Sequence, residues 1–228
     1  MTSTPNRAPT PEPLRRGRPA LTLVPAHLDD RTLLALLVGR TDPGTDPERL
    51  AAALLDRFGS LGAVVGASPG ELARASSAGP AVPTDFRLLR EFAIRLARED
   101  ACRRPVITSW TALLAYVRTA LAHEPREQFR ALYLDRRNIL LRDELVADGT
   151  VDHAPVYPRE VIRRALELSA SAMILVHNHP SGDPTPSRAD IEMTRQIVEA
   201  ARIFSLQVHD HLVVGREGTA SFKTLGLI

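Results

Sequence analysis

The stretch AMILVHNHPSGDPTPSRAD, which runs from Ala172 to Asp190, decides the fold of this 228-residue chain. Its first five residues are all apolar, which is typical of a buried β-strand. If the strand continues, His177 and His179 point to the same face, because side chains two positions apart share a face. Asp190 can add a carboxylate oxygen from the next element. Two imidazole nitrogens and one carboxylate oxygen, with a fourth position left for water, form the ligand set of a catalytic zinc site.

A structural interpretation of the same residues is also open. Most histidines are core or surface residues, and a His-x-His pair binds metal in only a minority of cases. Ser187 followed three residues later by Asp190 predicts a helix N-terminus, with Ser187 as the N-cap and Asp190 near the positive end of the helix dipole. The two interpretations are compatible, because a helix start is a rigid place to hold a ligand.

The spacing of these four residues carries a family resemblance. His-x-His, seven residues and then Ser-x-x-Asp resembles the signature of the JAMM (MPN+) metalloprotease family, and the wider segment resembles the bacterial RadC family in particular. The resemblance covers residues 108–228 and, more weakly, residues 29–100. The motifs that carry it are HNHPSGDPTPS, Gly149-Thr150-Val151, Pro158-Arg159-Glu160 and Asp210-His211.

The resemblance implies a Zn²⁺ cofactor held by His177, His179 and Asp190. Zinc lowers the pKa of a bound water towards ~7, and hydrolysis also needs a base that takes up the proton. JAMM enzymes use a glutamate at the head of a strand upstream of the histidines. Glu127 opens the segment EQFRALYLD in that manner and is the favoured base, whereas Glu144 in the following strand is the alternative.

The resemblance also assigns a role to the serine of the motif. In the family, the serine that corresponds to Ser187 donates a hydrogen bond to the developing oxyanion, and one such donor typically contributes ~3 kcal/mol to transition-state stabilisation. The sequence therefore gives two catalytic candidates, Glu127 and Ser187.

Other polar residues close to the motif receive structural interpretations. Asn178 points to the face opposite the histidines, and Asp183 lies in a turn-forming loop. His209 and His211 form a second His-x-His pair, but no Ser-x-x-Asp follows it. We expect His211 to support the ligands or to pack in the core. Cys102 is the only cysteine, so no disulfide can form within the chain.

Residues 105–228 predict an α/β domain. Residues 128–135 alternate, with Phe129, Ala131 and Tyr133 on one face of a strand and Leu132 and Leu134 on the other. We expect helices over residues 111–121, 157–168 and 187–204, and strands over 128–135, 139–145, 172–179, 206–214 and 219–223. With the resemblance, this order predicts a mixed-sheet JAMM-type sandwich, which is cytidine-deaminase-like.

Residues 27–104 predict a small all-helical domain that precedes the sandwich. We expect one helix capped by Asp30, one that starts at Pro47, one that starts at Ser68-Pro69 and one over residues 86–98. In RadC proteins this region resembles a helix-hairpin-helix module, and the glycine amides of its turn can hold a DNA phosphate.

The turn of that module is altered here. It reads SAGPAVP, with Ser77 in place of the first glycine, Val82 in place of a lysine and Pro83 in place of the last alanine. The loss of a flexible position and of a cation favours a helical packing domain over a DNA-gripping one. Weak binding to DNA without sequence preference remains the expectation if DNA is bound at all.

The charge of the chain is consistent with that view. Residues 1–105 hold 15 Lys and Arg against 12 Asp and Glu, and residues 106–228 hold 14 against 15. A DNA-binding surface should concentrate positive charge on one face or helix. The clearest basic cluster is RRGR at residues 15–18, inside residues 1–26, which are rich in Pro and Arg and are expected to be a disordered tail.

Composition limits the compartment and the class of function. No apolar stretch reaches the ~18 residues needed to span a bilayer, and the N-terminus lacks the apolar core of a secretory signal. We therefore expect a cytoplasmic protein that acts on a peptide or protein substrate, with no membrane partner. The favoured function is a zinc-dependent metalloprotease or isopeptidase. The alternatives are a DNA-repair-associated DNA-binding protein or nuclease, and a non-catalytic MPN scaffold. His177-Asn178-His179 is not an HNH nuclease motif, whose residues are spread over a hairpin and a helix.

Overall fold

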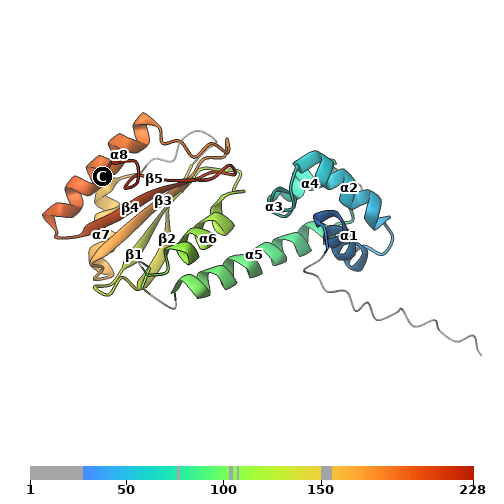
Figure 1. Cartoon of the computed structure of the whole chain (residues 1–228), viewed down its shortest axis with the longest axis horizontal. Helices are drawn as coiled ribbons and strands as arrows, with labels where there is room; N and C mark the ends of the chain where they lie inside the picture. Colours follow the sequence, from blue (N-terminus) through green and yellow to red (C-terminus); the bar gives the residue numbers. More distant parts are fainter. Residues whose placement is uncertain (1–27, 76–77, 103–104, 107, 150–155) are drawn as a thin grey trace, which may run out of the picture.

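The computed structural model describes residues 28–75, 78–102, 105–106, 108–149 and 156–228. A group of helices is followed by an α/β region, and the long helix α5 leads from one to the other (Figure 1). The helices are α1 Asp30–Thr41, α2 Pro47–Phe58, α3 Leu61–Gly66, α4 Pro69–Ala75, α5 Ala81–Cys102, α6 Trp110–Leu121, α7 Pro158–Glu167 and α8 Arg188–Ile203. The strands are β1 Gln128–Leu134, β2 Leu140–Asp148, β3 Ala172–Asn178, β4 Gln207–Val214 and β5 Thr219–Ser221. The expected tail over residues 1–26 lies outside the described residues, as does Ser77. No helix in the described part of the chain is long and apolar enough to cross a membrane.

The helices of the first region start and end where their capping residues lie, with three differences from the prediction. Asp29, not Asp30, caps α1, because its carboxylate accepts a hydrogen bond from the Thr32 amide at 2.7 Å. The short helix α3 was not predicted. Helix α5 starts at Ala81 instead of residue 86, so Pro83 lies in its first turn, where a missing amide is tolerated. These helices pack around one apolar cluster of their own.

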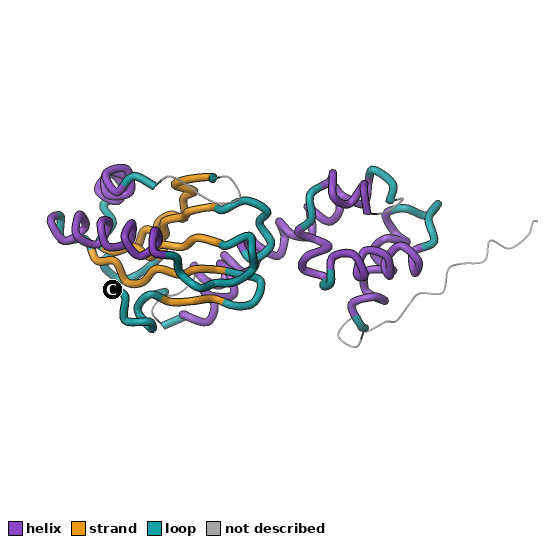
Figure 2. The backbone as a smooth tube through the Cα atoms, turned by 90° about the horizontal axis from the view of Figure 1, so that it is seen from above, coloured by secondary structure: helices purple, strands orange, loops and turns teal. Residues whose placement is uncertain are grey.

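The α/β region is a three-layer sandwich around a five-stranded sheet of order β2-β1-β3-β4-β5. Only β3 and β4 run parallel, and the other neighbours are antiparallel. Helix α6 covers one face of the sheet, while α7 and α8 pack on the other face (Figure 2). This arrangement confirms the expected mixed-sheet, JAMM-type sandwich.

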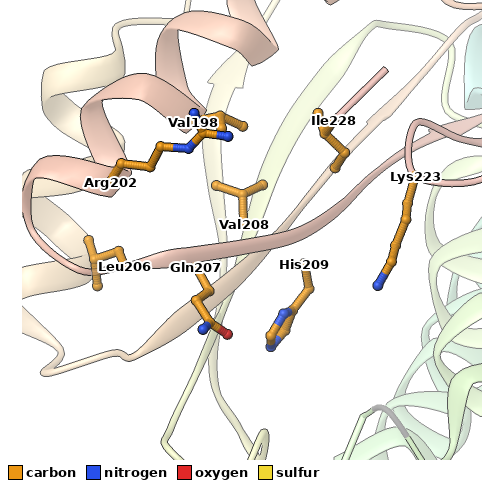
Figure 3. Close-up of a pocket in the computed structure, with 8 residues that line it drawn as sticks. All are labelled: Val198, Arg202, Leu206, Gln207, Val208, His209, Lys223 and Ile228. Atoms are coloured by element: carbon orange, nitrogen blue, oxygen red, sulfur yellow. The ribbon is translucent and has the colours of Figure 1, made fainter. Parts of the chain in front are cut away.

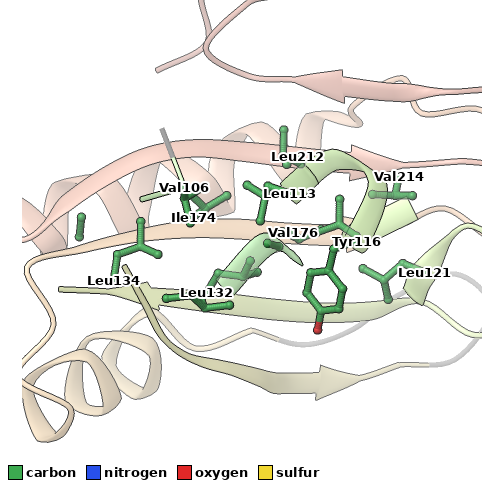
Figure 4. Close-up of a cluster of buried hydrophobic side chains, with 14 residues drawn as sticks. Val106, Leu113, Tyr116, Leu121, Leu132, Leu134, Ile174, Val176, Leu212 and Val214 are labelled. Carbon is green, nitrogen blue, oxygen red and sulfur yellow. The ribbon is translucent and has the colours of Figure 1, made fainter. Parts of the chain in front are cut away.

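Strand β1 shows how the alternating sequence builds both layers. Leu132 and Leu134 join the cluster beneath α6 (Figure 4). Phe129, Ala131 and Tyr133 join the cluster beneath α7 and α8, as their alternation predicted. The central strand β3 is buried over its whole length. This strand carries His177, and His179 follows directly after its last residue.

The two regions meet where α6 leads into β1. The Arg90 guanidinium of α5 donates to the Ala120 carbonyl at 2.9 Å and forms an ion pair with Glu124 at 2.5 Å. On α3, a Cβ added to Gly62 would lie 2.5 Å from His123 Nε2, and one added to Gly66 would lie 2.6 Å from His123 Cβ. The helices therefore pack closely against the segment that precedes Glu127.

Candidate metal centre

The two histidines of the motif lie at the end of the central strand. β3 ends at Asn178, but the backbone stays extended because the His179 amide donates to the Val214 carbonyl of β4 at 2.9 Å. The imidazole rings of His177 and His179 share one face, with their centroids 4.9 Å apart. The prediction that the strand presents both rings together is thereby confirmed.

Asp190 completes a set of three donors around one point. The Nε2 atoms of His177 and His179 are 3.0 Å apart. Asp190 Oδ1 lies 3.4 Å from His177 Nε2, and Asp190 Oδ2 lies 3.4 Å from His179 Nε2. A tetrahedral zinc with bonds of about 2.0–2.2 Å separates its ligand atoms by about 3.3–3.6 Å. The spacing and chemistry of this donor set therefore fit a zinc ion.

The far nitrogen of His179 is held by the loop. His179 Nδ1 lies 2.9 Å from the Asp183 carbonyl oxygen, which can only accept a hydrogen bond. Nδ1 therefore carries a proton, and Nε2 faces the donor set. The Asp183 side chain accepts from the Thr185 amide at 2.9 Å, so it forms a turn and is not a ligand, as its sequence context indicated.

Ser187 and Asp190 form the expected capping box at the start of α8. The Asp190 amide donates to Ser187 Oγ at 3.2 Å, and the Ser187 amide donates to Asp190 Oδ2 at 2.7 Å. Both serine and aspartate are thus fixed by the helix start itself. The Ser187 oxygen accepts in this box, and its hydroxyl also lies beside the Asp190 carboxylate, whose pKa it helps to lower.

Asp190 is ionised in this environment. Burial alone would raise the pKa of its carboxyl, but the neighbouring imidazoles of His177 and His179, together with the Ser187 hydroxyl, outweigh burial and hold that pKa well below its usual range. The same contact with Asp190 raises the pKa of His179. A carboxylate that stays charged while largely buried is a suitable ligand for a cation.

The loop between the histidines and α8 is locked in place by the turn after β4. Gly182 has φ +104°, a conformation that favours glycine. A Cβ on Gly215 would lie 2.0 Å from the Gly182 carbonyl oxygen, so only glycine allows this approach. The Arg216 guanidinium donates to the carbonyls of Pro180 and Ser181 at 3.1 and 3.0 Å.

Behind His177 lies a chain of buried polar side chains that the sequence did not fully reveal. His177 Nδ1 is 2.8 Å from His211 Nε2, and His211 Nδ1 is 2.6 Å from Thr194 Oγ1. Thr194 Oγ1 in turn donates to the Asp190 carbonyl at 2.6 Å. His211 contacts His177 directly, which is the position expected of a residue that would support the ligands. Thr194 was missed, although it lies four residues after Asp190, one helical turn along α8.

His209 and His211 do not form a second metal pair. The pairing of β3 with β4 shifts register between Val208 and Asp210, and this bulge separates the two rings. His209 Nε2 bonds to Asn138 Oδ1 at 2.6 Å. His209 borders a surface pocket of about 310 Å³ beside the C-terminal end of α8 (Figure 3). None of the residues that line this pocket belongs to the donor set.

Glu127 immediately precedes β1. β1 and β3 are antiparallel with Phe129 opposite His177, so continuing the pairing places Glu127 opposite His179 on the same face. The negative charge of Glu127 contributes to the raised pKa of His179, which indicates proximity. Asn178 has the structural role expected for it, because its side chain accepts from the Gln128 amide at 2.8 Å and donates to the Arg126 carbonyl at 3.0 Å.

Glu144, the alternative base, is engaged elsewhere. Its carboxylate forms a two-point ion pair with Arg164 of α7, at 2.7 and 2.5 Å. This pairing lowers the pKa of Glu144. In the sheet, Glu144 of the edge strand β2 lies opposite Ala131 of β1. Strand β1 therefore lies between Glu144 and the strand β3 that carries His177. The ion pair holds the Glu144 carboxylate against α7.

A buried central strand that ends in two histidines, followed by a helix that begins with Ser-x-x-Asp, defines an α/β sandwich of the JAMM type. Residues 107–227 match the family described as the RadC-like JAB domain. The chain is also 54% identical over 201 residues to a UPF0758 protein of Rhodobacter capsulatus, a match that covers 88% of this chain and 94% of the relative. The chain therefore belongs to the RadC family, as the motifs indicated.

Proposed function

We propose that this protein is a zinc-dependent hydrolase that cleaves peptide or isopeptide bonds in a peptide or protein substrate. The observation that carries the proposal is the convergence of His177, His179 and Asp190, with 3.0–3.4 Å between their donor atoms. In this proposal these three side chains hold Zn²⁺, Glu127 is the general base and Ser187 is a hydrogen-bond donor to the substrate.

The residues around the donor set divide the work of amide hydrolysis. Bound zinc would polarise the substrate carbonyl and lower the pKa of the attacking water. In this proposal Glu127, which the continued register of β1 and β3 places opposite His179, takes the proton from that water and returns it to the leaving amine. In this proposal the Ser187 hydroxyl donates to the oxyanion that develops on the carbonyl oxygen, while its oxygen accepts from the Asp190 amide. The capping box holds that hydroxyl at a fixed place.

Two experiments, metal analysis and an activity assay, test the proposal. Metal analysis of the purified protein should find one zinc per chain, and the double variant His177→Ala/His179→Ala should lose it. Hydrolysis is then assayed with degenerate fluorogenic peptide and isopeptide libraries, and nuclease activity is assayed in parallel on single- and double-stranded DNA.

The role of the base is tested by two isosteric substitutions. Glu127→Gln should keep the zinc and lower the rate of hydrolysis by about 10²–10⁴-fold, because an amide cannot accept a proton at neutral pH. Glu144→Gln is the matched control and should retain the wild-type rate, because Glu144 pairs with Arg164. Loss of activity in Glu144→Gln with full activity in Glu127→Gln would reverse the assignment. Metal-dependent cleavage of DNA alone would replace the proposed substrate class.

A further inference from the structure

We propose that Thr194 and His211 fix the tautomer of His177 so that its Nε2 lone pair faces the metal centre. Both would be positioning residues: neither is one of the three donors, and each acts through a neighbour. The inference deepens the metal centre of the proposed function and rests on it. It concerns a buried chain of hydrogen bonds from His177 through His211 and Thr194 to the backbone of α8.

The direction of the chain is set at Thr194. A threonine hydroxyl has one proton, and at Thr194 that proton lies in the 2.6 Å hydrogen bond to the Asp190 carbonyl oxygen. A carbonyl oxygen can only accept. Thr194 Oγ1 must therefore act as the acceptor in its 2.6 Å contact with His211 Nδ1, so Nδ1 of His211 carries a proton.

The same argument assigns the ring protons of His211 and then of His177. His211 has no exposed surface, and a neutral imidazole carries a single proton. With that proton on Nδ1, His211 Nε2 is an acceptor, and His177 Nδ1 must be the donor in their 2.8 Å contact. The proton of His177 is thus placed on the side away from Asp190, and the lone pair of His177 Nε2 points towards His179 and Asp190.

Two phenylalanine rings pack against His177 and His211 and fix the orientation of both imidazoles within this series of hydrogen bonds. Phe222 stacks on His211 with 4.5 Å between ring centroids, and Phe129 lies parallel to His177 at 6.2 Å. If Thr194 donated to His211 instead, every proton in the chain would shift by one place. His177 Nε2 would then carry a proton aimed at the other donors and could not bind a metal. The hydroxyl of Thr194 therefore selects the metal-competent arrangement.

The first test reads the tautomers directly in the metal-free protein. Two-bond ¹⁵N–¹H correlation spectra of ¹⁵N-histidine-labelled protein distinguish the Nδ1–H from the Nε2–H form. We expect the Nδ1–H form for both His177 and His211. The Nε2–H form at His211 would overturn the proposal, and this measurement needs no variant to fold.

The second test uses matched substitutions and zinc affinity measured by competition with a chelating dye. Thr194→Val keeps the shape of the side chain but removes the acceptor for His211, so it should lower zinc affinity by about 10- to 100-fold and shift His177 towards the Nε2–H form. Thr194→Ser restores the hydroxyl and should return both properties to within a few-fold of wild type. Ile197→Val, a buried change on the same helix outside the chain, should leave zinc affinity unchanged.

The outcomes separate this inference from the proposed function. Equal zinc affinity in Thr194→Val and wild type, or equal losses in the valine and serine variants, would refute the role of the hydroxyl. A wild-type protein that binds no zinc would contradict the proposed function, while the tautomers of its metal-free form would still decide the hydrogen-bond chain. A wild-type protein that binds zinc but lacks hydrolytic activity would leave this inference supported if the serine variant rescues the valine variant.

Discussion

Gly215 is the residue on which the shape of the ligand loop depends most directly. A Cβ at this position would lie 2.0 Å from the Gly182 carbonyl oxygen and 3.1 Å from the Pro184 nitrogen, and both are backbone atoms that cannot move aside alone. We expect Gly215→Ala to displace the loop between His179 and Ser187, to lower the free energy of unfolding by about 2 kcal/mol or more, and to weaken zinc binding.

The control for this prediction lies three residues away. A Cβ on Gly218 would meet only Pro184 Cγ at 3.8 Å, which is an ordinary van der Waals contact. Gly218→Ala should therefore keep the wild-type melting temperature and zinc affinity. Calorimetry and chelator competition on both variants provide the comparison, and equal behaviour of the two alanine variants would contradict the steric argument.

Individual residues were predictable from the sequence where their role depends on local geometry. His177 and His179 share a face because a strand has a period of two, and Ser187 and Asp190 pair because a helix start requires it. Thr194 was not predictable in this way. Its role depends on α8 packing over the sheet and on β4 lying next to β3, and these are contacts between segments distant in the sequence.

At the scale of an element, β2 offers two neighbouring carboxylates in different environments. Asp143 is almost fully buried, and it accepts hydrogen bonds from Arg130 of β1 at 2.9 Å and from the Tyr116 hydroxyl of α6. Glu144 pairs with Arg164, and both of these side chains are about one-third exposed. Asp143 therefore ties an edge strand to the rest of the sandwich, while Glu144 makes a surface contact.

We expect Asp143→Asn to lower the free energy of unfolding by about 2–4 kcal/mol, because it leaves the largely buried Arg130 without a counter-charge. Burial and Asp143 both raise the pKa of Tyr116, so the phenol stays protonated and cannot supply the missing negative charge beside Arg130. Glu144→Gln should cost about 1 kcal/mol or less, since exposed ion pairs contribute little. Urea denaturation measures both, and a larger loss in the glutamate variant would contradict this ranking.

The elements themselves were predictable to different degrees. The ends of α2, α4 and α8 follow from capping residues and prolines that can be recognised in the sequence. Helix α3 has only six residues, too few for a periodic apolar pattern, and it forms because Ser60 caps it and Val64 is buried in the helical core. The bulge in β4 left no signal in the sequence, because a one-residue shift of pairing is decided by the neighbouring strand.

At the scale of the whole molecule, the helical region contacts the segment that presents Glu127. Arg90 bonds to Ala120 and Glu124, and α3 packs on His123, four residues before Glu127. Burial and the nearby Arg216, Arg90 and Arg118 lower the pKa of His123, so it is neutral at pH 7 and adds no charge to this contact. The helical region thus supports the base side of the proposed site, a role that requires no DNA.

The turn that could hold DNA in this region is already capped by a carboxylate. The Gly79 amide donates to Asp42 Oδ2 at 2.9 Å, and Thr45 Oγ1 donates to the same oxygen at 2.7 Å. These two hydrogen bonds lower the pKa of Asp42, so it is negatively charged at neutral pH. A phosphate approaching the Gly79 amide would have to displace this carboxylate and would be repelled by its charge. The altered turn and the balanced charge of the chain also argue against tight binding of DNA.

We therefore expect the protein to bind duplex DNA no more tightly than about 10⁻⁶ M at physiological salt, without sequence preference. Fluorescence anisotropy with labelled duplexes, at 50 and 200 mM salt, measures this. Asp42→Asn removes the negative charge while keeping an acceptor for the Gly79 amide, and it should strengthen binding only slightly, because no lysine stands at Val82 to contact a phosphate. Gly79→Ala would bring a Cβ within 2.7 Å of Asp42 Oδ2 and serves as a probe of the turn. Submicromolar binding by the wild type that Gly79→Ala abolishes would show that the turn still grips DNA, and it would restore the DNA-repair-associated alternative.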